Sequence, residues 1–76
     1  MVEEKVIEDI ARRVHRRERR AITKREYGAM RPGFVATIVI DEVFQAGIPE
    51  SDVPHVRNEV ARLLPGLRSK DRRKAS

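Results

Sequence analysis

Apolar residues recur at helical spacing along the chain, and the longest apolar run sets the centre of the expected fold. Residues 34–46 read FVATIVIDEVFQA. At about 100° per residue, Phe34 and Ile38 fall on the same half of the helix as Asp41 and Glu42. The other half carries Val35, Ala36, Val39, Ile40, Val43, Phe44 and Ala46. This pattern predicts a central helix that is contacted from two sides.

The flanking residues mark the ends of this helix. Pro32 and Gly33 precede it, and Gly47 with Pro49 follows it, which is typical of a helix start and a helix stop. A strand over residues 34–40 is the alternative, because β-branched residues are frequent there. The separation of Pro32 from Gly47 is long for a strand, so the helix is favoured.

Two further stripes predict helices before and after this run. In residues 3–22 one arc holds Val6, Ile7, Ile10, Ala11, Val14, Ala21 and Ile22. In residues 53–64 the stripe consists of Val53, Val56, Val60, Leu63 and Leu64, and Pro65 with Gly66 is expected to stop the helix there. A capping-box pattern at Thr23 to Glu26, with Tyr27 as a staple, predicts a short connector helix over residues 24–30.

The expected fold class is therefore all-α. A small three-helix domain with a short connector helix should occupy residues 1–67, and residues 68–76 should form a disordered basic tail. The predicted core consists of Val6, Ile10, Val14, Ile22, Tyr27, Val39, Ile40, Val43, Phe44, Val56, Val60 and Leu63. The 76 residues contain no cysteine, no basic and apolar leader and no run long enough to span a membrane, so we expect a cytoplasmic protein.

Positive charge is concentrated in two places. The chain has 17 Lys and Arg against 12 Asp and Glu, a net charge of +5. The first cluster lies opposite the apolar arc of residues 3–22, and the second lies in the expected tail. Arg binds phosphate through a planar fork of donors, so a face lined with Arg suits nucleic acid. The candidate nucleic-acid-binding residues are Arg12, Arg13, Arg16, Arg19, Arg20, Lys24, Arg72 and Arg73.

Two residues within the first cluster differ from the rest. Arg17 falls on the apolar arc, where its stem is expected to cover the core. Glu18 is the single acid among these bases. Residues 16–21, Arg-Arg-Glu-Arg-Arg-Ala, resemble the arginine-rich motif of lambdoid phage antitermination N proteins, short helices that bind an RNA hairpin. Tyr27 stands roughly where that motif carries a stacking aromatic. The resemblance is local, implies chemical analogy and not kinship, and favours RNA over DNA.

Other binding functions stay open at this stage. In the main alternative, Phe34 and Ile38 form an exposed apolar seam for a homodimer or a partner helix, and the Arg face contacts an acidic protein. A membrane-surface helix is less suited, because the apolar arc of residues 3–22 has no Trp or Phe. A helix-turn-helix over residues 39–58 is disfavoured by the acids and prolines of its would-be recognition segment.

The sequence gives little support for catalysis. His15 and His55 are far apart along the chain and have no nearby nucleophile or paired carboxylates. His55 and Glu59 could share one helix face, but a third metal ligand is not evident. We therefore expect neither an enzyme nor a bound metal or cofactor. Asp41 and Glu42 are expected to form ion pairs with Arg31, Arg57 or Arg62 and not to act in catalysis.

Overall fold

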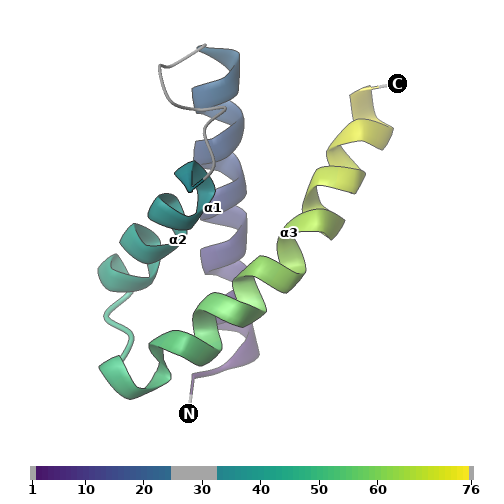
Figure 1. Cartoon of the computed structure of the whole chain (residues 1–76). Helices are drawn as coiled ribbons and strands as arrows, with labels where there is room; N and C mark the ends of the chain where they lie inside the picture. The colour runs from purple at the N-terminus through teal and green to yellow at the C-terminus, as the bar shows by residue number, and fades with distance from the viewer. Residues whose placement is uncertain (1, 25–32, 76) are drawn as a thin grey trace.

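Three helices make up the structure, which is a computed structural model that describes residues 2–24 and 33–75, with side chains described as far as Lys70. Helix α1 spans Glu4–Thr23, α2 spans Phe34–Gln45 and α3 spans Val53–Ala75, with a short 3-10 turn, η1, at Glu50–Asp52. Figure 1 shows α2 running back along α1 and α3 starting below the end of α2 and crossing α1, so that the start of α1 and the end of α3 lie at opposite ends of the molecule. The described residues contain no strand, which confirms the all-α prediction and excludes the strand alternative for residues 34–40.

Helix α1 agrees with its sequence pattern to within a residue. Its buried arc consists of Ile7, Ile10, Ala11, Val14 and Ala21. These side chains recur at intervals of three, four and seven, so they share one face of the helix, and all but Ala21 belong to the core cluster with α2 and α3. The connector helix predicted for residues 24–30, with Tyr27, lies outside the described residues apart from Lys24, which caps α1.

Helix α2 has the predicted ends but a different orientation about its axis. Gly33 adopts φ +89° at the N-cap and Gly47 adopts φ +71° after the C-cap, conformations that favour glycine. The buried face consists of Ile38, Val39, Glu42 and Val43. Ile40 and Phe44, which were predicted in the core, are 49% and 84% exposed.

The apolar seam expected at Phe34 and Ile38 is therefore wrong. Ile38 is only 4% exposed, and Phe34 is half-buried against the core. The physical reason is that α2 is apolar on most of its circumference, so its own pattern does not decide which side is covered. Contacts with α1 and α3 cover the side that includes Ile38 and leave Phe44 in solvent.

Helix α3 is longer than the sequence predicts. It passes through Pro65 and Gly66 and continues to Ala75, so the predicted end at Leu64 is wrong. Proline removes one helical hydrogen bond. Packing offsets this loss, because Leu64 is buried, Leu67 packs against the core, and Arg68 bonds to α1.

One apolar cluster holds the three helices together. Its members are Ile7, Ile10, Ala11, Val14, Ile38, Val39, Val43, Val56, Val60 and Leu64. Ile22, predicted in the core, lies at the end of α1 and is 47% exposed, because α3 has diverged from α1 at that level. In the described part of the chain, no helix is both long and apolar enough to cross a membrane.

Candidate nucleic-acid interface

The face of α1 that points away from the core is lined with arginine. Arg12, Arg13, Arg16, Arg19 and Arg20 are all exposed. They are exposed because the core arc of the same helix, from Ile7 to Ala21, occupies the opposite side. Lys24, at the C-cap, is exposed beyond them. The predicted residues of α1 are thus brought together on one face, which we call the Arg face: Arg12, Arg13, Arg16, Arg19 and Arg20.

The single acid of this segment does not oppose the Arg face. Glu18 points toward α3, where Arg68 Nε and Nη2 donate to its Oε2 at 3.3 and 3.0 Å. The Glu18 side chain is only 13% exposed. Because the charge of Glu18 is balanced by Arg68 across the α1–α3 contact, the Arg face keeps its positive potential.

Arg17 is also separated from the Arg face. Its Nη1 donates to Asp41 Oδ2 at 2.6 Å and lies 3.6 Å from Glu42 Oε1, so it joins α1 to α2. Arg57 and Arg62, two of the predicted partners of these acids, are therefore not the partners found, and the third, Arg31, lies outside the described residues. The contact of Arg17 with α2 depends on how α1 and α2 pack together, which the sequence pattern does not contain.

The contact of Arg17 with α2 changes the pKa of Arg17 and the pKa of Asp41. The hydrogen bond from Arg17 holds the pKa of Asp41 below its ordinary value, and a second bond from Gln45 Nε2 at 3.0 Å adds to this effect against partial desolvation. The hydrogen bond to Asp41 in turn raises the pKa of Arg17. Both groups are therefore charged at neutral pH, and the Arg17 charge is used within the fold.

Three arginines of the Arg face form no ion pair with another described residue: Arg13, Arg16 and Arg20. Arg12 lies 3.7 Å from Asp9, an exposed pair that is worth little in water. Arg13, Arg16 and Arg20 therefore offer guanidinium groups that an external anion can bind without first breaking an ion pair with another described residue.

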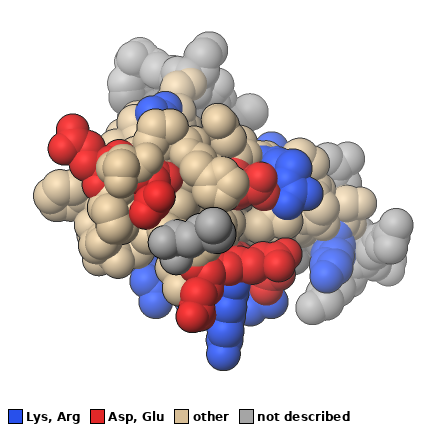
Figure 2. Space-filling model, turned by 90° about the horizontal axis from the view of Figure 1, so that it is seen from below, with Lys and Arg blue, Asp and Glu red and all other residues tan. Residues whose placement is uncertain are grey.

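Charge is divided along the length of the molecule. Acids lie in the first turns of α1 and in η1, including Glu3, Glu4 and Glu50, which are exposed. Figure 2 views the molecule from that end, where Asp and Glu side chains are scattered over a surface that consists mostly of other residues, with Lys and Arg side chains between them. The acids make this end less suited to phosphate than the later turns of α1.

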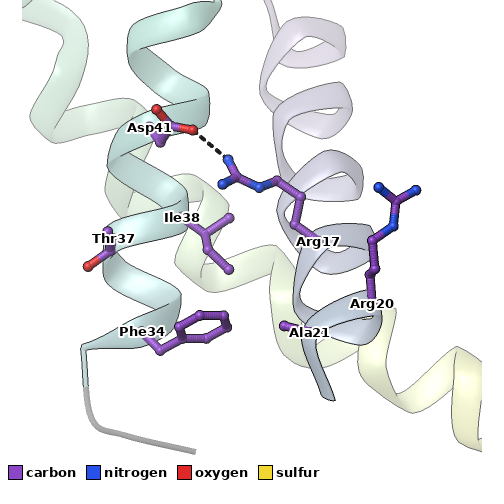
Figure 3. A pocket seen from close by; sticks show the side chains of 7 residues that line it. All are labelled: Arg17, Arg20, Ala21, Phe34, Thr37, Ile38 and Asp41. Atoms are coloured by element: carbon purple, nitrogen blue, oxygen red, sulfur yellow. Dashed lines mark hydrogen bonds and ion pairs between the residues drawn. The ribbon is translucent and has the colours of Figure 1, made fainter. Parts of the chain in front are cut away.

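Two cavities adjoin the Arg face where α1 meets α2. The smaller, about 240 Å³, is lined by Arg13, Arg16, Arg17, Arg20 and Glu42. The larger, about 540 Å³, is lined by Arg17, Arg20, Ala21, Phe34, Thr37, Ile38 and Asp41. Figure 3 shows the Phe34 ring pointing from α2 toward Ala21, with Arg17 reaching across to Asp41. The hydrophobic pattern indicated neither cavity, because each is formed by two helices.

No protein-family model, curated protein or solved structure matches the chain. The side chains themselves are therefore the basis on which a function can be proposed.

The other predicted site residues do not lie on the Arg face. The side chains of Arg72 and Arg73, predicted to bind nucleic acid, lie outside the described residues. Lys70 is exposed on α3. Phe34 lines the larger cavity and Ile38 lies in the core, so neither forms the outward seam that was predicted for a partner.

The described residues do not bring together three or more His, Cys, Asp or Glu side chains that could hold a metal ion. Glu59, considered as a ligand with His55, instead accepts hydrogen bonds from Arg62 Nη2 at 2.6 Å and Nε at 3.0 Å. These bonds lower the pKa of Glu59. The arrangement is that of an exposed ion pair on α3.

Proposed function

We propose that this protein is a small cytoplasmic regulatory or accessory factor that binds nucleic acid through the Arg face of α1. The observation that carries the proposal is the separation of the arginines into two groups. Arg17 and Arg68 neutralise acids within the fold, whereas Arg13, Arg16 and Arg20 remain exposed on one side of one helix.

The spacing of these side chains supports binding to a phosphate backbone. Successive turns of a helix are about 5.4 Å apart, so arginines at intervals of three and four form a row along α1. Neighbouring phosphates of one strand are spaced at a comparable interval, and each guanidinium fork can bridge two phosphate oxygens. Binding of this kind releases counterions and therefore weakens steeply with salt.

The test is a salt titration of binding to labelled single-stranded RNA, single-stranded DNA and duplex DNA. We expect measurable binding to at least one of these near 50 mM salt, with a log-log slope that becomes shallower by about one unit for each phosphate-contacting arginine replaced. Arg16→Gln is the single variant, and Arg12, Arg16, Arg19 and Arg20 changed together to Gln form the combined variant.

Arg57→Gln is the matched control, since it removes the same charge from an exposed position on α3. It should leave the slope nearly unchanged. Unaltered binding by the combined variant, with the fold retained by circular dichroism, would exclude the Arg face as the nucleic-acid site.

A second candidate function is supported by a separate observation. Phe44 is 84% exposed and Ile40, one turn earlier on α2, is 49% exposed, which together place an apolar stripe in solvent. Exposed apolar stripes of this kind are used for homodimers and for partner helices. Sedimentation over a range of concentrations tests this function. Association that is lost in Phe44→Ser would support a protein-interaction module, and a monomer at high concentration would exclude the homodimer.

A further inference from the structure

The larger cavity between α1 and α2 has one apolar wall and one polar rim. Ala21, Phe34 and Ile38 supply the apolar wall, and Phe34 contributes the aromatic ring. The polar rim consists of Thr37, Asp41, Arg17 and Arg20. The volume of about 540 Å³ falls in the range of sites that hold small organic molecules, about 300–1,000 Å³.

Contacts within the fold engage two polar side chains of the rim. Thr37 Oγ1 donates its hydrogen to Gly33 O at 3.0 Å, and Figure 3 shows this hydroxyl on the side of α2 away from Ala21 and Arg17. Both Arg17 and Gln45 donate to Asp41 Oδ2. The Phe34 ring is therefore the group of this cavity that best suits a ligand, because it can stack on another flat ring.

The smaller cavity has the opposite preference. Its lining includes Arg13, Arg16 and Arg20, and it shares Arg17 and Arg20 with the larger one. The two cavities are therefore neighbours, one suited to an anion and the other to a neutral aromatic ring. A nucleotide combines these two parts, since its phosphate and its base are joined through one sugar.

We propose that one unpaired nucleotide of a bound strand places its base against Phe34 in the larger cavity while its phosphate is held by Arg13, Arg16 and Arg20. This inference rests on the proposed nucleic-acid function and deepens it. A base that is stacked and paired in a duplex is not available to the cavity without extrusion from the helix. The site therefore selects single-stranded or looped nucleic acid.

The experiment compares two RNA strands of equal length, one of adenylate and one with abasic sugars at every position. Both strands have the same phosphates, so the Arg face alone binds them equally. Base–aromatic stacking contributes enough that we expect wild-type protein to bind the adenylate strand at least about fivefold more tightly.

Phe34→Leu removes the aromatic face and retains most of the apolar packing. We expect it to weaken adenylate binding by about tenfold and to leave abasic binding unchanged. Phe44→Leu is the matched control, because Phe44 belongs to the same helix but faces solvent on another side. It should alter neither affinity.

The outcomes separate this inference from the function on which it rests. If wild-type protein binds neither strand at low salt, the nucleic-acid proposal and the base site both fail. If it binds both strands equally with a steep salt dependence, the base site alone is refuted. Should Phe34→Leu fail to fold by circular dichroism, the comparison of the two strands with wild-type protein still decides, because it requires no variant.

Discussion

The contact of Arg17 with α2 gives the sharpest prediction about stability. Glu42 is the one charged residue that is buried among the described side chains, and its side chain is 10% exposed. The Arg17 guanidinium lies 3.6 Å from its carboxylate. Replacing Arg17 with Ala leaves that carboxylate in a mostly apolar contact without its cation, and an uncompensated buried charge is costly.

The expected cost is moderate because Arg17 is itself 45% exposed, so that water weakens the pair and can approach the carboxylate after the change. We expect Arg17→Ala to lower the free energy of unfolding by about 1–2 kcal/mol. In a domain of this size that corresponds to a fall in Tm of about 4–16 °C.

The assay is thermal and urea unfolding followed by circular dichroism at neutral pH. Arg16→Ala is the matched control, because it lies on the same helix in solvent, and its effect should stay within about 0.5 kcal/mol. In the double variant with Glu42→Gln, the Arg17→Ala change should cost less, since the buried charge is gone. Equal stability of Arg17→Ala and Arg16→Ala would refute the role given to this contact.

Three further predictions concern pH, the length of α3 and the core. The pKa of Asp41 is lower in the folded protein than its ordinary value of 3.8. The contribution of Asp41 to stability is therefore present above pH 3.8 and is lost as the pH falls through the folded pKa. Asp41→Asn should flatten the fall in Tm that is measured over this acid range. Gly66→Ala should stabilise the protein to urea by about 0.5–1 kcal/mol, because Gly66 lies inside a helix with open space beside it, whereas a loss would contradict a helix through that position. Ile10 is 1% exposed in the core, so Ile10→Ala should lower the free energy of unfolding by about 2–5 kcal/mol. A change below about 1 kcal/mol in the same unfolding assay would show that Ile10 is not central to the core.

The candidate site was only partly predictable. The Arg face follows directly from the period of α1, because the positions of Arg12, Arg16 and Arg19 relative to Ile10 are fixed once the segment is a helix. The same period places Glu18 on the side opposite Arg16, but its pairing with Arg68, 50 residues later, did not follow from local sequence. The cavity beside Phe34 likewise depends on the distance between two helices, which no sequence period contains.

The sequence by itself determined where the helices are. Buried and exposed residues alternate at helical period in α1, and Gly33 and Gly47 fix the ends of α2 because their left-handed backbone is costly for other residues. These are local effects, and each is decided within a few residues. The predicted ends of α1 and α2 are accordingly confirmed to within one residue.

Only the tertiary structure decided which face of α2 is covered and where α3 ends. The outer surface of α2 is apolar nearly all around, so its orientation depends on the shapes of α1 and α3, which bury Ile38 and expose Phe44. Pro65 and Gly66 are local stop signals, and they are overridden because Leu67 and Arg68 gain contacts with the rest of the fold only when the helix continues. Local preferences at such positions differ by a few kcal/mol at most, which packing between helices can exceed.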